Sequence, residues 1–168
     1  VIRQVQETNG IERIRFSSVE PNIITEEFMS ELSKMDKVCD HFHLSLQSGC
    51  DRTLKRMNRK YDTAGYMRAV EILRKYMPNA AVTTDIIAGF PGESDRDFEE
   101  SLKFAESVGF LKIHAFPYSP KRGTPAAAMP EQIQNSIKNE RTARLIELSD
   151  RMGDEFIGGF VGKSMPVL

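Results

Sequence analysis

The 168-residue chain lacks the features that would place it outside the cell or in a membrane. It contains only two cysteines, Cys39 and Cys50, and no CxxC pair, which fits a reducing cytosol better than a secreted disulfide scaffold. No run of about 18 apolar residues occurs, so we expect no membrane span and no membrane partner. No signal-peptide pattern follows Val1. The composition therefore predicts a cytoplasmic protein.

The chain also has little net charge. Its formal charge is −1 at pH 7, so no overall field draws it to nucleic acid or anionic lipid, and any such partner would need a local patch. Low-complexity tracts are absent, and 40% of the residues are hydrophobic. This composition is sufficient for one domain with a core.

The two ends of the sequence suggest that it belongs to a longer protein. The chain starts at Val1 without an initiator methionine, in a stretch that resembles the last turns of a helix with Gly10 as its C-terminal stop. It finishes with GKSMPVL, which resembles the beginning of a strand. We interpret the sequence as an excised piece.

Strand-like and helix-like segments alternate along the chain. Strand character is found in Arg13–Glu20, His41–Ser48, Ala81–Phe90 and Leu111–Ser119. Expected helix starts lie at Thr25, Asp51, Thr63 or Ala64, and Ser94, and a long helix is expected after Pro130, with an apolar stripe of Ile133, Ile137, Leu145, Leu148, Met152 and Phe156. Strands that recur roughly every 30–40 residues with a helix in each gap predict βαβ units and a parallel sheet.

The predicted strands each have one apolar and one polar face, because side chains alternate across a strand. The polar set is Arg15, Ser17, His43, Ser45, Gln47, Asp85, His114 and Tyr118. A flat parallel sheet covered on both sides would be apolar on both faces, and a filled TIM barrel has an apolar interior. The pattern therefore predicts a barrel-like curve with a polar inner surface. Because buried polar groups without partners are costly, we expect a ligand there.

Pro117 falls within the last predicted strand. Proline cannot donate a hydrogen bond to a strand ladder, so this strand should lie at the edge of the sheet or end near Pro117. The predicted curve is therefore open and not closed.

The segment TTDIIAGFPGES, from Thr83 to Ser94, predicts a buried strand that ends in a tight loop and leads into a helix. In one interpretation Gly89 and Gly92 only supply permissive backbone for the turn. In the other they allow a ligand to approach the strand end closely, with Asp85 on the inner face. A phosphate-binding P-loop is not an option, since GxxxxGK[ST] is absent.

Four long segments resemble the radical S-adenosylmethionine methylthiotransferases in order and spacing. They are RIRFSSVEP, HFHLSLQSGCDRTLKRMNRKY, TTDIIAGFPGESDRDFEES and HAFPYSPKRGTPAAAMP, and the resemblance covers essentially the whole chain. LSLQSGC is most similar to the branch that acts on threonylcarbamoyladenosine in tRNA. The isopentenyladenosine branch more often has proline at the position of Ser45, and the ribosomal-protein branch departs further around Gln47.

The resemblance implies an α/β fold, the C-terminal part of an open six-stranded (β/α) radical SAM barrel, or partial TIM barrel. This chain would supply four parallel strands, the third to the sixth, with outer helices and a long C-terminal helix. Residues 1–129 would form the partial barrel and residues 130–161 a helix packed on it. Residues 162–168 would begin a truncated RNA-binding domain of the TRAM type.

The resemblance also implies cofactors and partners. They are S-adenosylmethionine, two 4Fe-4S clusters in the full-length protein, a tRNA substrate, a reductant and a sulfur donor. In such enzymes a CxxxCxxC loop binds the cluster that reduces S-adenosylmethionine. That loop is absent here, and ten residues separate Cys39 from Cys50. We therefore expect no metal ligands or catalytic residues in this chain, and no activity from it alone.

The expected cofactor-binding residues follow from the same resemblance. They are Ser17, Ser45, Gln47, Asp85, Gly89, Phe116 and Tyr118. The second strand of this chain would hydrogen-bond the ribose or methionine part, the Asp85 strand would lie along the adenosyl part, and the last strand would frame the adenine. The alternative for each residue is structural: satisfied polar groups at a barrel rim, a tight turn, or core packing.

The spacing Cys39-x-His41-x-His43 raises the question of a zinc site, since all three residues share one strand face. Structural zinc sites use four ligands and usually a CxxC pair, so we do not expect a metal here. Cys50 begins a predicted helix, where a thiolate could be stabilised. We favour a small buried side chain at that position.

Basic side chains follow the predicted strand ends, on the side where a substrate would arrive. They are Lys55, Arg56, Arg59, Lys60, Lys121 and Arg122. A solvated surface is the default interpretation, and contact with tRNA phosphates is the functional one.

We therefore expect part of an enzyme that inserts a methylthio group into threonylcarbamoyladenosine next to a tRNA anticodon. One alternative is a methylthiotransferase for another tRNA adenosine or for a ribosomal protein. An alternative of another class is a non-catalytic barrel domain that binds nucleotides or RNA.

Overall fold

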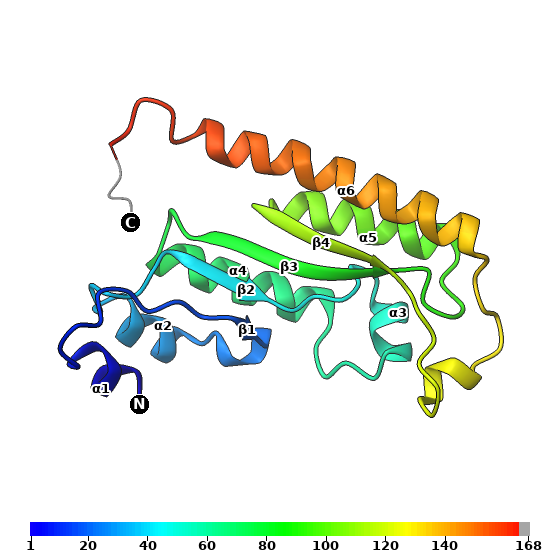
Figure 1. Cartoon of the computed structure of the whole chain (residues 1–168), viewed down its shortest axis with the longest axis horizontal. Helices are drawn as coiled ribbons and strands as arrows, with labels where there is room; N and C mark the ends of the chain where they lie inside the picture. Colours follow the sequence, from blue (N-terminus) through cyan, green and yellow to red (C-terminus); the bar gives the residue numbers. More distant parts are fainter. Residues whose placement is uncertain (165–168) are drawn as a thin grey trace.

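A computed structural model describes residues 1–164 and confirms the predicted α/β class. Strands β1 (Ser18–Val19), β2 (His41–Leu44), β3 (Ala81–Ala88) and β4 (Lys112–Pro117) form one parallel sheet in the order β1-β2-β3-β4 (Figure 1). The helices are α1 (Ile2–Gln6), α2 (Glu26–Leu32), α3 (Asp51–Arg56), α4 (Thr63–Tyr76), α5 (Asp95–Val108) and α6 (Asn135–Gly158), with 3-10 turns η1 (Pro21–Ile23) and η2 (Pro125–Ala128).

The strands are shorter than predicted, most of all the first. Only Ser18–Val19 belongs to the sheet ladder, and Ile14 makes an isolated bridge with Val38. The second strand ends at Leu44, and beyond it Gln47, whose φ of 70° is left-handed, makes only an isolated bridge with Ile86. A residue in that conformation cannot continue a regular strand.

Two helix signals in the sequence are confirmed at α5. The Ser94 hydroxyl accepts the N–H of Asp97, and the Asp97 carboxylate accepts the Ser94 N–H, which makes a capping box. Gly109 ends the helix with a φ of 66° in the left-handed region.

Two other predicted helix ends, at α3 and α1, are wrong. Helix α3 is capped by Cys50 and not by Asp51, whose carboxylate instead accepts the Thr63 N–H across the loop at 2.7 Å. Helix α4 begins at Thr63, as predicted, with Asp62 as its N-cap. Helix α1 ends at Gln6, before Gly10.

The apolar face of the sheet is buried under α4, α5 and α6. Fully buried side chains from the strands and these helices include Phe42, Leu44, Ile86, Ile113, Tyr66, Leu73, Phe98 and Leu145. The Tyr66 hydroxyl donates to the Leu44 carbonyl at 2.9 Å, so even the polar atom of this core tyrosine is satisfied.

Helix α6 lies along β4, as its apolar stripe predicts (Figure 1). Leu145, Leu148 and Met152 are buried, and a Cβ at Gly153 would approach the Leu111 carbonyl oxygen to 2.8 Å. None of the helices in residues 1–164 is long and apolar enough to cross a membrane. Most of the predicted strand at residues 162–168 lies outside the described residues, and the domain boundaries remain predictions.

Candidate functional site

The predicted sidedness of the strands is confirmed along β2 and its continuation. Phe42, Leu44 and Leu46 are fully buried in the core, whereas His43 and Gln47 are only partly buried on the opposite, inner face. Strand β4 is an edge of the sheet, as Pro117 predicts. The inner face of the sheet therefore carries polar side chains beside cavities.

A continuous row of polar contacts crosses this inner face. Arg15 Nε donates to His41 Nδ1 at 3.1 Å, and the Thr83 hydroxyl lies 3.3 Å from His41 Nε2 and 3.0 Å from His43 Nδ1. His43 Nε2 is 3.4 Å from a carboxylate oxygen of Asp85. Burial, and then the Arg15 charge, lower the pKa of His41, which keeps its imidazole neutral and able to accept from Arg15.

Two cavities lie along this row. The first, which we call the histidine cavity, has a volume of about 560 Å³. Its lining residues are Arg15, Phe16, Ser17, His41, His43, Thr83, Leu111, Lys112 and His114. Of the expected cofactor-binding residues, only Ser17 is here.

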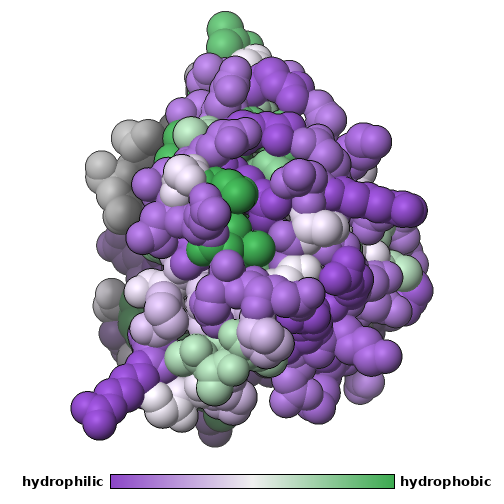
Figure 2. Space-filling model, turned by 90° about the vertical axis from the view of Figure 1, so that its right-hand side faces the viewer, coloured by the Kyte–Doolittle hydropathy of each residue, from purple (hydrophilic) through white to green (hydrophobic). Residues whose placement is uncertain are grey.

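The second, which we call the carboxyl-end cavity, has a volume of about 710 Å³ and collects four of the seven expected residues. Its lining residues are Gln47, Arg59, Asp85, Ile87, Phe116, Pro117, Tyr118, Ser119, Lys121, Thr124 and Ala126. The loops that follow the strands lie at this end of the molecule, which Figure 2 shows to be largely hydrophilic with a hydrophobic patch near its centre.

The backbone fixes Gln47 against the Asp85 strand. The Gln47 N–H donates to the Asp85 carbonyl at 2.8 Å, and the Gln47 carbonyl accepts the Ile87 N–H at 3.0 Å. These bonds hold a non-glycine residue in the left-handed region, where most residues are disfavoured. Gln47 and Asp85 thus lie in the same wall of the carboxyl-end cavity because of backbone hydrogen bonds between distant segments. The strand pattern in the sequence did not predict these bonds.

Ser45 and Gly89 line neither cavity. The Ser45 carbonyl accepts the Tyr61 hydroxyl at 2.8 Å. Gly89 is buried with a φ of 73°, and a Cβ there would lie 2.5 Å from Cγ of Lys138. The close approach that Gly89 permits is therefore with the Lys138 side chain.

A buried ion pair next to Gly89 was missed by the sequence reasoning. Arg141 Nη1 lies 3.0 Å from the Glu93 carboxylate, and their side chains are only 5% and 2% exposed. The same carboxylate accepts the Gly89 N–H. Burial raises the pKa of Glu93, and the Gly89 N–H and Arg141 oppose that rise. The sequence does contain a signal for this ion pair. Arg141 is a charged residue one helical turn before Leu145 on the otherwise apolar stripe of α6.

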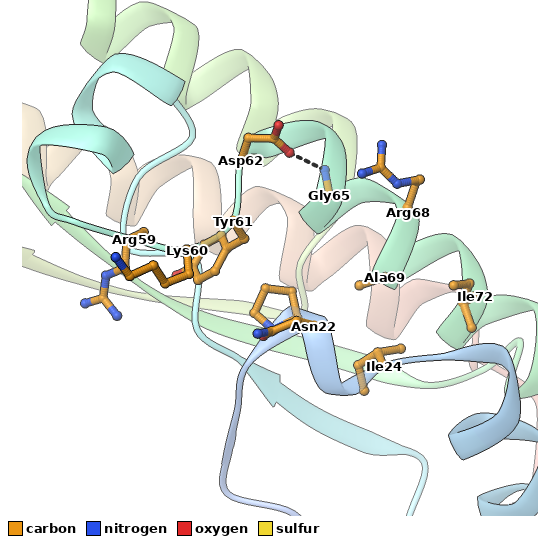
Figure 3. Close-up of a pocket in the computed structure, with 11 residues that line it drawn as sticks. Asn22, Ile24, Arg59, Lys60, Tyr61, Asp62, Gly65, Arg68, Ala69 and Ile72 are labelled. Carbon is orange, nitrogen blue, oxygen red and sulfur yellow. Dashed lines mark hydrogen bonds between the residues drawn. The ribbon is translucent and has the colours of Figure 1, made fainter.

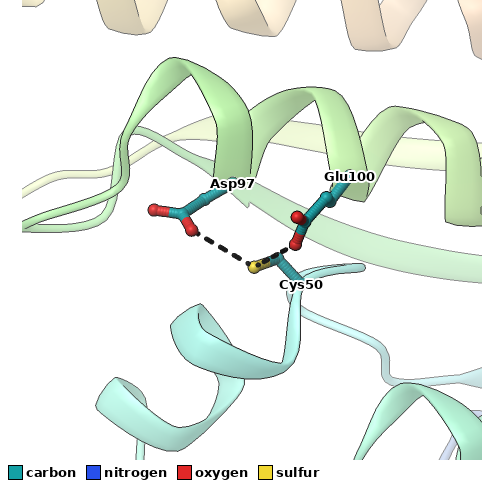
Figure 4. Close-up of side chains that lie close together, drawn as sticks. All are labelled: Cys50, Asp97 and Glu100. Atoms are coloured by element: carbon teal, nitrogen blue, oxygen red, sulfur yellow. Dashed lines mark hydrogen bonds between the residues drawn. The ribbon is translucent and has the colours of Figure 1, made fainter.

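The Cys50 thiol lies between two carboxylates (Figure 4). Its Sγ is 3.5 Å from Oδ1 of Asp97 and 3.4 Å from Oε2 of Glu100. Burial raises the pKa of Cys50, so the thiol stays protonated and can donate. Within residues 1–164 these three are the one group of possible metal ligands that converges. Because Asp97 also forms the capping box of α5, we interpret the group as structural.

A third cavity has a basic lining and lies between η1, the α3–α4 loop and α4 (Figure 3). Its volume is about 620 Å³, and its cationic residues are Arg59, Lys60 and Arg68. We call it the basic cavity. Arg59 also lines the carboxyl-end cavity, a position that its place in the sequence did not predict.

The carboxyl-end cavity combines polar groups with aromatic and apolar surfaces. It offers a carboxylate acceptor at Asp85, aromatic rings at Phe116 and Tyr118, and an apolar surface at Ile87. One of its residues, Arg59, carries a buried polar atom, Nε, with no hydrogen-bond partner in the described chain. Orphaned buried groups of this kind are uncommon and fit a site that binds a polar molecule. A parallel α/β sheet with its site at the carboxyl ends of the strands is typical of enzymes that bind a nucleotide-like cofactor.

The chain belongs to the radical SAM superfamily, whose family model matches residues 1–105. Among solved structures, coproporphyrinogen III oxidase (HemN) of Escherichia coli, described as a radical SAM enzyme, is similar, with a TM-score of 0.69 and 16% sequence identity. The match covers 84% of this chain and 32% of that one. This similarity supports the partial barrel fold.

Two kinds of curated protein match the whole chain. The threonylcarbamoyladenosine tRNA methylthiotransferase MtaB of Chlamydia pneumoniae is 44% identical over 168 residues, which are 40% of that protein. A tRNA-2-methylthio-N(6)-dimethylallyladenosine synthase of Thermoanaerobacter sp. (strain X514) is 42% identical over 168 residues, which are 36% of that protein. The chain thus spans well under half the length of these relatives.

Proposed function

We propose that this chain is part of a radical SAM enzyme that adds a methylthio group to threonylcarbamoyladenosine next to the anticodon of tRNA. The observation that carries the proposal is the convergence of Gln47, Asp85, Phe116 and Tyr118 in one cavity at the carboxyl ends of the strands. Identity of 44% to a threonylcarbamoyladenosine tRNA methylthiotransferase supports the chemistry.

In this proposal the carboxyl-end cavity holds the adenosyl part of S-adenosylmethionine. When bound and reduced, that cofactor supplies a radical that abstracts hydrogen from the substrate. The Asp85 carboxylate is available to accept hydrogen bonds from ribose hydroxyls, and the rings of Phe116 and Tyr118 offer surfaces for the adenine. His43, 3.4 Å from Asp85, positions that carboxylate.

The residues of this chain do not fit an iron–sulfur cluster. The sequence contains two cysteines and no CxxxCxxC loop. Cys50 is buried, and its Sγ contacts two carboxylates, so it is a poor cluster ligand. In the proposed enzyme the cluster, the reductant and the sulfur donor act outside the residues of this chain.

Binding of S-adenosylmethionine to the chain, measured by isothermal titration calorimetry, tests the proposed site. We expect Asp85→Asn to weaken binding about tenfold, since hydrogen bonds to a charged group contribute about 1.5–3 kcal/mol. Asp154→Asn, at an exposed position on α6, is the matched control and should bind as wild type does. Equal affinities for both variants would contradict the assignment of the cavity.

A second candidate substrate is the dimethylallyl-type adenosine, because a synthase of that modification is 42% identical. The two substrates are separated by methylthio transfer assays with the enzyme that contains this chain. We expect product on tRNA that carries threonylcarbamoyladenosine and none on tRNA that lacks it. The reverse result would assign the chain to the other branch. Absence of transfer to any tRNA, with RNA still bound, would favour a non-catalytic binding domain.

A further inference from the structure

A fourth cavity opens between the end of β4, the η2 loop and the start of α6, and we call it the α6 cavity. Its volume is about 660 Å³. Its lining includes Tyr118, Pro120, Asn135 and Lys138. No aspartate or glutamate is among the described residues that line this cavity, so lysine provides the only formal charge in its wall.

The Lys138 ammonium has no anionic partner within the described residues. Lys138 is only 5% exposed, and no hydrogen bond or ion pair of its Nζ is formed in residues 1–164. Its Nζ lies 5.3 Å from the centre of the Tyr118 ring. Nζ itself is not among the buried polar atoms that lack a partner, so it is open to solvent at the cavity and accessible to an anion.

Gly89 makes this placement possible. The aliphatic part of Lys138 packs where a Cβ would be at residue 89, with Cγ only 2.5 Å from that position. The side chain is thus fixed against the loop after β3, and its charged end lies at the wall of the cavity. A fixed ammonium loses less conformational freedom on binding an anion than a mobile surface lysine does.

Two further groups at the cavity favour an anion. The 24-residue helix α6 begins at this cavity. The side chain of its N-cap residue, Gln134, makes no capping bond, so the first backbone N–H groups of α6 are available to a ligand. The Tyr118 hydroxyl is buried without a partner in the described chain. A helix N-terminus beside a lysine is an arrangement that binds phosphate groups.

We propose that the α6 cavity binds a phosphate group through the Lys138 ammonium, the Tyr118 hydroxyl and the first N–H groups of α6. The source that we favour is a phosphate of the RNA backbone, and this part rests on the proposed function. Lys121 and Arg122, which are exposed and follow the Pro120 that lines the cavity, would contact neighbouring phosphates. Free phosphate is the other source, and the experiments below separate the two.

The first experiment titrates the chain with inorganic phosphate and follows the Lys138 side-chain resonances by NMR, with binding also measured by calorimetry. We expect saturable shifts at Lys138 in the wild type. Lys138→Met keeps the stem against Gly89 but removes the charge, and it should weaken binding about tenfold or more, as expected for one charged hydrogen bond. Lys103→Met, at an exposed lysine of α5, should leave binding unchanged.

The second variant, Tyr118→Phe, keeps the ring under Lys138 and removes only the hydroxyl, so it guards against a folding defect in Lys138→Met. We expect severalfold weaker phosphate binding from it. Wild-type protein that shows no saturable phosphate shift at Lys138, or a Lys138→Met variant that is folded and binds equally, would overturn the proposal.

The third experiment measures the affinity for a short single-stranded RNA by fluorescence anisotropy. If RNA supplies the phosphate, Lys138→Met lowers RNA affinity and Lys103→Met does not. If inorganic phosphate binding depends on Lys138 but RNA affinity does not, the RNA part of the proposal is wrong and the site takes free phosphate. If the enzyme that contains this chain modifies no tRNA but phosphate still binds at Lys138, the proposed function is wrong and the phosphate site is still supported.

Discussion

At the residue scale, the glycine after β3 makes a contact with α6 that its motif did not predict. Gly89 was expected beside the cofactor, but it is buried under α6 and receives the Lys138 stem. Its left-handed φ and the missing Cβ are both needed, because the turn and the helix meet at this one position. The glycine of this loop motif therefore allows α6 to pack closely against the loop after β3.

Replacing Gly89 by alanine tests this role. Gly89→Ala adds left-handed strain of about 1–2 kcal/mol and also a clash with Lys138, so we expect a loss of about 2–4 kcal/mol in the free energy of unfolding. Gly10→Ala is the matched control, because Gly10 has a φ of 84° but no atom within 4 Å of its added Cβ. Urea denaturation measures both. Equal losses in the two variants would contradict the contact with Lys138.

At the element scale, α6 is held to the body of the fold by a polar contact as well as by its apolar stripe. Arg141 on this helix bonds Glu93 in the loop between β3 and α5, and it also bonds Asp95, the first residue of α5, at 2.7 Å. A buried charge that loses its partner is strongly destabilising, although the intact pair contributes little net stability. The ion pair thus makes the docking of α6 specific.

Substitution of Arg141 tests this docking. Arg141→Met should lower the free energy of unfolding by about 3–5 kcal/mol at neutral pH, because it leaves the Glu93 carboxylate buried and uncompensated. Arg151→Met, which breaks an exposed pair with Glu106, should cost about 0–1 kcal/mol.

The pH dependence of that loss identifies its cause. Burial already raises the pKa of Glu93 above its ordinary value of 4.5, and loss of the Arg141 cation raises it further. A raised folded-state pKa of an acid makes folding less favourable as the pH rises through it, because the charged form is penalised. The deficit of Arg141→Met should therefore shrink as the pH falls through the pKa of Glu93. A deficit that is constant with pH in urea titrations would point to lost packing instead.

At the scale of the whole molecule, a net charge of −1 conceals an uneven distribution. Arginines of α6 are paired with carboxylates, as in Arg144 with Glu99 and Arg151 with Glu106. In contrast, the three cations of the basic cavity, Arg59, Lys60 and Arg68, form no ion pair within residues 1–164. Unpaired cations near the strand ends favour contact with a polyanion there.

Charge reversal in the basic cavity tests the expected contact with tRNA. Lys60→Glu should weaken binding of a labelled tRNA and should reduce the slope of log affinity against log salt by about one, as expected for one lost phosphate contact. Lys103→Glu makes the same charge change on exposed α5. Anisotropy titrations at several salt concentrations give both quantities. An identical slope for Lys60→Glu and wild type would show that this lysine is only solvated.

The strand faces could be predicted because alternation is a local property. Gln47, Asp85 and Tyr118 were assigned to the inner face from the order of residues alone, and the cavity contains all three. Ser45 follows the same alternation, since it is partly buried between the buried Leu44 and Leu46, but it lines neither cavity. The ion pair of Glu93 with Arg141 joins residues 48 positions apart, beyond any local pattern.

The sequence by itself determined the alternation of strands and helices, the parallel order of the sheet, the caps of α5 and the polar side of each strand. These follow from steric and hydrogen-bonding preferences that act over a few residues. Only the tertiary structure decided that Gly89 receives Lys138, that Arg59 lies between two cavities, and that Gln47 is tied to the Asp85 strand. Those contacts join distant segments, and they form because burying the apolar face of the sheet brings the loops at its carboxyl end together.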